Sequence, residues 1–178
     1  MKRLLPLVLL VAGCTATPVA TAPTTTTTTT TTTETTVVTT SPRIDTPKKL
    51  PADPCRLLTA ADFDSPLAGT PAPGPAIPRS CVFQEGNTGT DADMFVVVAF
   101  QGAFAKPADA VGEMLIEGHS TAISFVVKPG VMQSVYTVAV NATESYMVIV
   151  DLPKANSAQV SQIALGKAQK AFKRLVTT

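Results

Sequence analysis

The chain has 178 residues, with 14 Lys plus Arg against 13 Asp plus Glu, two Tyr and no Trp. This balance excludes the basic face with interleaved aromatic side chains that is typical of nucleic-acid-binding proteins. We therefore expect no nucleic-acid partner.

The amino terminus reads as an export signal. Lys2 and Arg3 form a positive region, Leu4–Val11 is a short apolar run, and small residues precede Cys14. An apolar helix of eight residues spans about 12 Å, which is too short for a hydrocarbon core of about 30 Å. We expect residues 1–13 to be a signal peptide rather than a permanent membrane span.

The tetrapeptide Val11–Cys14 resembles the lipobox of bacterial lipoproteins. In that class the cysteine receives a diacylglyceryl group and becomes the first mature residue. Two acyl chains give stable attachment, since each buried methylene contributes about 0.8 kcal/mol. We expect lipid attachment at Cys14 and a protein held on the extracytoplasmic side of the cell membrane. An ordinary cleaved signal with an incidental cysteine is the alternative.

Residues 14–51 are predicted to be a disordered stalk. Thr24–Thr33 is an unbroken threonine run, and prolines flank it on both sides. Such a tract has no apolar face whose burial would offset the entropy of ordering the chain. Threonine with proline is also typical of O-glycosylated stalks. Glycosylated stalk and bare spacer both remain open.

Residues 52–178 are long enough for one domain with its own core. Asp53–Phe63 predicts a helix with Asp53 as N-cap and Pro54 at its first position. Lys106–Ile116 predicts a second helix, and a third, capped by Asn156 or Ser157, ends near Val176. Apolar runs bounded by turn residues predict five strands: Ser80–Glu85, Met94–Phe100, Thr121–Lys128, Gln133–Val140 and Ser145–Leu152.

This order of elements predicts an α+β fold. Adjacent strands joined by turns at Gly86–Gly89, Pro129–Gly130 and Asn141–Glu144 indicate an antiparallel sheet. We expect a single domain with about five strands, helices packed on one face of the sheet, and a C-terminal helix.

The three cysteines are an odd number for an exported protein. If Cys14 carries lipid, Cys55 and Cys81 are left to form a disulfide, which the compartment outside the membrane permits. The loop would be worth about 3.5 kcal/mol in the chain-entropy model. A metal site is the rival interpretation, but two cysteines and the single His119 fall short of the usual four ligands. We therefore predict no metal and no cofactor.

Several of these features together resemble an actinobacterial lipoprotein family known as domain of unknown function 3558. They are the lipobox, the Thr/Pro stalk, Asp53-Pro54-Cys55 leading into Leu57-Leu58-Thr59, Cys81 opening a strand, and Gly118 to Ala122 before the next strand. The resemblance covers most of the chain. It implies a cell-envelope location and an α+β domain, without an established activity.

Few side chains point to catalysis. His119 sits in a Gly-His-Ser segment expected to be an exposed turn, and a triad would require Ser120 or Ser124 to align with it, yet no Gly-x-Ser-x-Gly elbow is present. The acid pairs Asp62/Asp64 and Asp91/Asp93 are expected to cap backbone groups in turns.

Two further patterns have plain structural interpretations. Asn141-Ala142-Thr143 matches a glycosylation sequon, but a turn role suffices. The basic residues of the last helix are expected to form a solvated face near its carboxyl end, with contact to anionic lipid or polymer as the alternative. They are Lys167, Lys170, Lys173 and Arg174.

Three functions remain. The first is a non-catalytic module that binds an envelope protein partner. The second is a carrier or sensor of a small apolar ligand, in a cavity between helices and the strands Met94–Phe100 and Ser145–Leu152. The third is a hydrolase that uses His119.

Overall fold

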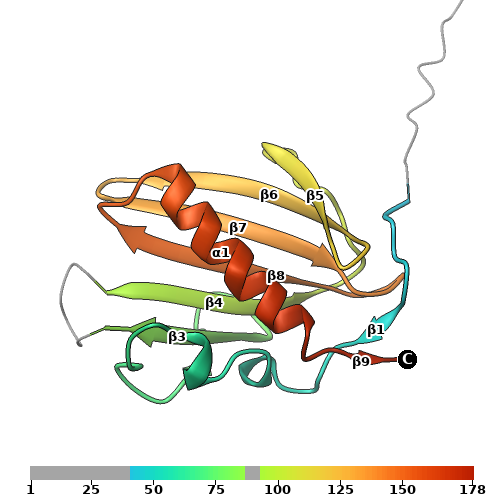
Figure 1. Cartoon of the computed structure of the whole chain (residues 1–178), viewed down its shortest axis with the longest axis horizontal. Helices are drawn as coiled ribbons and strands as arrows, with labels where there is room; N and C mark the ends of the chain where they lie inside the picture. Colours follow the sequence, from blue (N-terminus) through green and yellow to red (C-terminus); the bar gives the residue numbers. More distant parts are fainter. Residues whose placement is uncertain (1–40, 87–92) are drawn as a thin grey trace, which may run out of the picture. The chain divides into compact units, whose positions relative to one another are not determined.

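A seven-stranded antiparallel sheet dominates the computed structural model, which describes residues 41–86 and 93–178 (Figure 1). The strands in these two ranges are β1 (Lys48–Lys49), β2 (Ala72–Pro73), β3 (Ser80–Glu85), β4 (Met94–Gln101), β5 (Gly112–Ile116), β6 (His119–Lys128), β7 (Val131–Ala139), β8 (Ser145–Pro153) and β9 (Val176–Thr177). The large sheet has the order β2-β3-β4-β8-β7-β6-β5, and β1 pairs with β9 in a second sheet.

The fold in the described ranges is mostly β, so the predicted α+β fold with about five strands and several packed helices is wrong. Nine strands form two antiparallel sheets, and one α-helix, α1 (Ser157–Phe172), packs against β7 and β8. The five predicted strands are present. Three of the other strands, β1, β2 and β9, were not predicted, because each has two residues, too few to show an alternating pattern. The remaining difference is β5, which the sequence analysis assigned to a helix.

The hydrophobic core lies between the large sheet and α1. Val96, Val98, Val148 and Val150 on β4 and β8 are completely buried, and Val160, Ala164 and Ala168 on α1 are buried with them. Opposed residues of antiparallel strands share a face, which explains why alternate valines on both strands reach the same core. The predicted helical stripe of α1 is therefore its core-facing side.

Tyrosine hydroxyls fasten α1 to the sheet. Tyr146 on β8 donates to the carbonyl oxygen of Ala168 at 2.8 Å, and the Tyr136 and Ser161 hydroxyls lie 2.7 Å apart. Burial raises the pKa of Tyr146 well above its ordinary value. The hydroxyl therefore stays protonated and keeps this hydrogen bond.

The predicted helix at Asp53–Phe63 is two short 3-10 helices, η1 (Pro54–Arg56) and η2 (Ala60–Asp62). Asp53 caps the first as predicted, accepting from the Cys55 N–H at 2.9 Å. Thr59 adopts an extended conformation (φ −129°, ψ 167°) and begins the second with a capping box. A new N-terminal cap within the segment interrupts the helix, which is why a continuous α-helix does not form.

The predicted helix at Lys106–Ile116 is wrong, because residues 112–116 form β5 and pair with β6. A two-residue turn joins the strands, with positive φ at Glu117 (49°) and Gly118 (81°). Positive φ at both central residues is typical of the type I′ turn, which is common in two-residue hairpins. Gly112 also lowers helix propensity within the segment.

The described residues 41–86 and 93–178 belong to one compact unit, so the folded part includes residues before the boundary expected at residue 52. Ile44 forms an isolated bridge with His119, and β1 pairs with β9 at the carboxyl end. Leu50 is buried in the core. No helix in the described ranges is long and apolar enough to cross a membrane.

Candidate functional site

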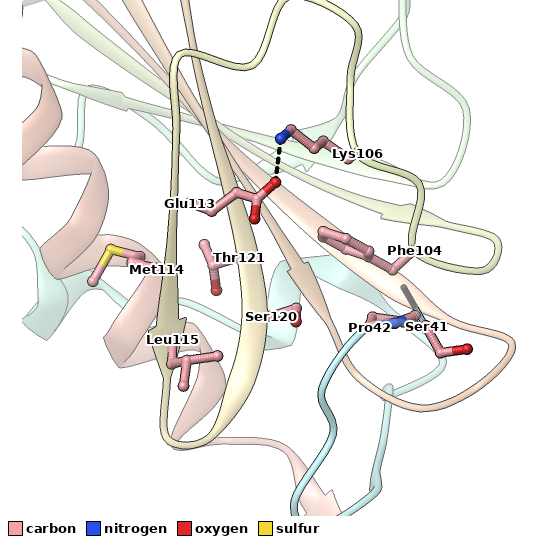
Figure 2. A pocket seen from close by; sticks show the side chains of 9 residues that line it. All are labelled: Ser41, Pro42, Phe104, Lys106, Glu113, Met114, Leu115, Ser120 and Thr121. Atoms are coloured by element: carbon pink, nitrogen blue, oxygen red, sulfur yellow. Dashed lines mark ion pairs between the residues drawn. The ribbon is translucent and has the colours of Figure 1, made fainter. Parts of the chain in front are cut away.

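A pocket of about 340 Å³ opens beside β5 (Figure 2). Three stretches build it: the start of the described chain, the connection from β4 to β5, and the β5–β6 hairpin. The residues that line it are Ser41, Pro42, Phe104, Lys106, Glu113, Met114, Leu115, Ser120 and Thr121. The connection 102–111 thus runs from β4 to β5, the edge strand of the large sheet, and places Phe104 and Lys106 beside it.

The charged groups at this pocket neutralise each other. Lys106 forms an ion pair with Glu113, and both side chains are more than half exposed, at 56% and 58%. An exposed pair of this kind contributes little to stability. Its effect on the pocket is electrostatic. Because the two charges cancel, these residues do not favour the binding of a charged ligand.

The hydroxyl groups of β6 in this pocket already make hydrogen bonds within the domain. The Ser120 Oγ accepts from the Arg43 N–H at 2.8 Å, and the Thr121 hydroxyl donates to the His119 carbonyl oxygen at 3.2 Å. Phe104, Leu115 and Pro42 supply apolar surface beside them. This chemistry suits the binding of an uncharged apolar group.

His119 is fully buried, which corrects the expectation that it lies in an exposed turn. Its Nδ1 lies 2.9 Å from the carbonyl oxygen of Ala139 and its Nε2 3.0 Å from that of Thr46. The ring also contacts Phe172 edge-on, with centroids 4.7 Å apart. His119 lies at the first residue of β6 and not in the turn, because Glu117 and Gly118 form the turn.

The candidate triad partners do not meet His119. Successive side chains of a strand alternate between faces, so Ser120 and Ser124 point away from the histidine on β6. Ser124 instead lies near Asp109, with 3.4 Å between the Ser124 Oγ and Asp109 Oδ1. The sequence placed these residues close along the chain, and the alternation of the strand separates them.

Three of the four basic residues expected to form a solvated face, Lys170, Lys173 and Arg174, are exposed, whereas Lys167 is buried. Lys167 is 4% exposed, and its Nζ donates to the Asp62 carbonyl oxygen at 2.7 Å while lying 3.8 Å from Glu85 Oε2. Burial lowers the pKa of Lys167, and the nearby Glu85 carboxylate only partly opposes this effect. Lys170 also donates to the Asp62 carbonyl oxygen, at 2.9 Å, and it is exposed like Lys173.

Asp62 has the capping role predicted for it. Its carboxylate accepts from the Thr59 N–H at 2.7 Å and pairs with Arg174 at 2.8 Å. Burial raises the pKa of Asp62, but the hydrogen bonds from Thr59 and Arg174 outweigh it, so the pKa is lowered. These contacts join η2 to the end of α1 and are structural.

Other sequence-predicted groups lie apart from the pocket. Asp64 is exposed, Asp93 is buried and accepts from the Gln84 side chain at 2.6 Å, and Asp91 lies outside the described residues. Asn141 accepts from the Thr143 N–H at 2.9 Å, which is the expected turn role. No group of three or more metal-ligating side chains occurs in residues 41–86 and 93–178.

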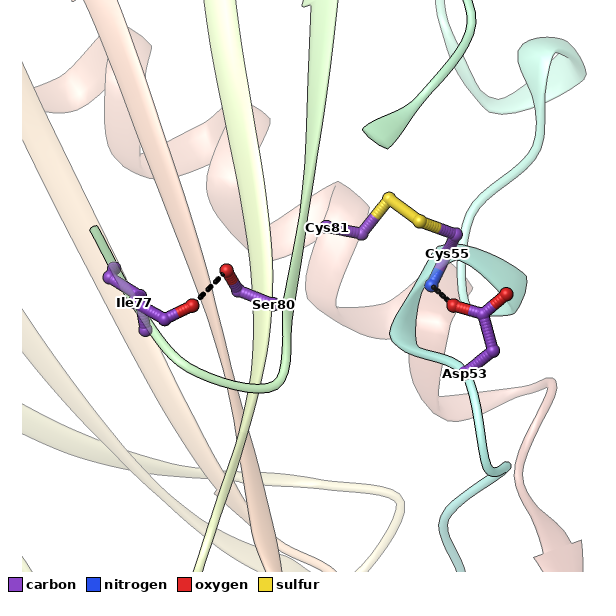
Figure 3. Close-up of a disulfide and its surroundings, with 5 residues drawn as sticks. All are labelled: Asp53, Cys55, Ile77, Ser80 and Cys81. Carbon is purple, nitrogen blue, oxygen red and sulfur yellow. Dashed lines mark hydrogen bonds between the residues drawn. A yellow bond between two sulfur atoms is a disulfide. The ribbon is translucent and has the colours of Figure 1, made fainter. Parts of the chain in front are cut away.

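Cys55 and Cys81 form the predicted disulfide, with their Cα atoms 5.0 Å apart (Figure 3). The bond links η1 to the first residues of β3, and Asp53 caps the same short helix. Cys14, the signal segment and the threonine run lie outside the described residues.

No motif in the sequence pointed to the pocket residues Phe104, Lys106, Glu113 and Leu115. Three of them fall in the segment that was assigned to a helix. The signal for two of them is Glu117-Gly118 between two apolar runs, which is a hairpin signature. Recognising that turn would have placed Glu113 and Leu115 on a strand.

Comparisons with known proteins give little further information. No family model matches the chain, and no curated protein matches it. A crystal structure of a protein from Bacteroides thetaiotaomicron is similar over 53% of this chain and 38% of that chain, with 14% identity and a TM-score of 0.32. The chain thus spans well under half of that protein, and a likeness at this TM-score carries no argument.

Proposed function

We propose that this chain is a lipid-anchored cell-envelope protein whose outer domain binds a protein partner without catalysing a reaction. The lipobox at Val11–Cys14 and the threonine-rich stalk support the location. Resemblance to the lipoprotein family of unknown function supports the same location. The pocket beside β5 is the binding surface in this proposal.

The composition of the pocket is the observation that carries the proposal. Lys106 and Glu113 are paired with each other, and the Ser120 oxygen already accepts a backbone hydrogen bond. The side chain of His119 is buried among Ala139, Thr46 and Phe172, where a substrate in the pocket does not reach it. We therefore do not propose a hydrolase that uses His119.

Site-specific photo-crosslinking in living cells of the source organism tests the proposal. A photoreactive residue in place of Leu115 is expected to capture the same partner in repeated experiments, whereas one in place of Val176 is not. Both side chains are exposed, at 44% and 61%, but Val176 lies on β9 outside the pocket. The purified partner should bind the Phe104→Ala variant about tenfold more weakly than the wild-type chain. Equal capture at both positions would overturn the proposal.

A small apolar ligand in the same pocket is the second candidate. The volume of about 340 Å³ lies within the range of ligand sites, roughly 300–1,000 Å³. The cavity expected between sheet and helix is not its location, because Val96, Val98, Val148 and Val150 are core residues. Native mass spectrometry of the chain purified from its own cells should then show a bound small molecule that Phe104→Ala removes.

A further inference from the structure

The two outer strands of the large sheet differ in how they are protected. β2 has two residues and contains Pro73, with Pro71 and Pro75 beside it. Short length and proline are features that prevent an edge from pairing with another strand. β5 at the other edge has five residues without proline, and in the described ranges it pairs with β6 alone.

Exposed apolar side chains concentrate at the β5 edge. Among described residues, six large hydrophobic side chains are exposed, and four of these lie next to or on β5 and β6: Val111, Leu115, Val126 and Val127. Val127 is 77% exposed and Val111 65%. β6 also continues beyond β5, because Gly112 pairs with Ile123 while β6 runs on to Lys128. The exposed edge formed by β5 and the end of β6 is therefore longer than β5 alone.

The register indicates which backbone groups face outward. In a hairpin with a two-residue turn, the closing pair exchanges both backbone hydrogen bonds, and here that pair is Ile116 and His119. Bonding pairs recur at every second residue, so Met114 and Gly112 also face β6. The N–H and C=O groups of Glu113 and Leu115 then point to the free edge. These are the groups to which an added strand would bond.

The pocket lies on the side of β5 where the Glu113 and Leu115 side chains emerge (Figure 2). A strand added at the edge would alternate its own side chains, and those on this face would lie next to Phe104 and Leu115. Because Lys106 neutralises Glu113, an uncharged side chain fits better here than a charged one. Backbone bonding and a side-chain pocket together are the elements of recognition by strand addition.

We propose that an extended peptide segment of a partner protein adds to the β5–β6 edge as a further strand and places an apolar side chain in the pocket. This inference rests on the proposed function and adds that the partner binds through an extended segment. Its recognition is by main-chain hydrogen bonds at Glu113 and Leu115 and by one side-chain contact.

Peptides selected from a random displayed library against the immobilised full chain provide the probe. A selected peptide is then resynthesised with single N-methyl groups along its backbone, each of which removes one N–H donor. Strand addition predicts that N-methylation at every second residue weakens binding about tenfold or more, while the intervening positions change it little. Uniform or absent sensitivity along the peptide would overturn the inference.

Protein variants give the second measurement. Leu115→Lys should weaken peptide binding about tenfold, because lysine at an edge opposes strand pairing. Phe95→Lys is the matched control, since Phe95 is exposed to a similar extent, 39% against 44%, but lies on β4. Equal loss in both variants counts against the edge.

The two proposals fail differently. Peptide binding that Phe104→Ala weakens but that shows no alternating N-methyl pattern would overturn strand addition and leave the binding pocket standing. Peptide binding insensitive to both Phe104→Ala and Leu115→Lys would overturn both. Dimerisation of the wild-type chain that Leu115→Lys abolishes would overturn the proposed partner in favour of a second copy.

Discussion

His119 connects three parts of the domain through its buried ring. It lies within hydrogen-bond distance of the carbonyl oxygens of Thr46 and Ala139 and packs edge-on against Phe172. His119→Ala removes the ring and leaves two carbonyl groups without that partner. We expect a loss of about 3 kcal/mol in the free energy of unfolding, measured by urea denaturation. Ser120→Ala on the same strand is the control, and a comparable small loss in both variants would contradict this role.

We expect Asp62 to make the stability of the domain sensitive to acid. Its pKa is lowered, since hydrogen bonds from Thr59 and Arg174 outweigh the raising effect of burial. A carboxylate whose pKa is lower in the folded state contributes stability above its unfolded value, about 3.9, and loses it as the pH falls through the folded value.

We therefore expect the urea midpoint of the wild-type chain to fall as the pH is reduced below about 4. The Asp62→Asn variant should be less stable at neutral pH and should show a flatter dependence below that point. Identical pH profiles for the two proteins would show that Asp62 is not the group responsible. Asp64→Asn is the control, because Asp64 is an exposed neighbour.

At the scale of elements, the disulfide holds η1 against β3. The sequence separation of 26 residues between Cys55 and Cys81 makes the bond worth about 3.5 kcal/mol in the chain-entropy model. The double variant Cys55→Ala/Cys81→Ala should lose roughly that amount of unfolding free energy. Comparison of reduced and oxidised wild-type protein in the same urea titration supplies the control. A difference below about 1 kcal/mol would indicate that the loop is already restricted in the unfolded chain.

Elements with a clear period were predictable, whereas elements defined by their partners were not. β3 has the predicted bounds Ser80–Glu85, and α1 begins after Asn156, one of the two caps that the sequence predicts. β1 and β9 pair with each other although they lie far apart in the sequence, and a strand of two residues shows no pattern of its own. β5 was missed because apolar residues at 111, 114 and 115 also fit a helical period.

The same distinction applies to the candidate site. Sequence alone identified Cys55 and Cys81, since an odd cysteine count with a lipobox leaves one pair. The pocket depends on the connection 102–111, which carries Phe104 to β5, and no local pattern records that path. The burial of Lys167 is similar, because it depends on Asp62 and Glu85, more than eighty residues earlier in the chain.

At the scale of the whole molecule, the proposed location depends on Cys14. If its sulfur carries a diacylglyceryl group, the mature chain begins at that residue, and two acyl chains keep the protein at the membrane. Mass spectrometry of the mature protein should then give an amino-terminal peptide that starts at Cys14 and carries the lipid. The Cys14→Ala variant should lack this modification and should no longer incorporate labelled fatty acid.

Cys55→Ala is the matched control for this experiment, because it removes a cysteine outside the signal region. It should keep the lipid and lose only the bond to Cys81. An unmodified Cys14 in the mature wild-type chain would contradict the proposed lipid anchor. Detection of the Cys55–Cys81 disulfide in that protein would still indicate an oxidising compartment, so the two measurements test anchoring and export separately.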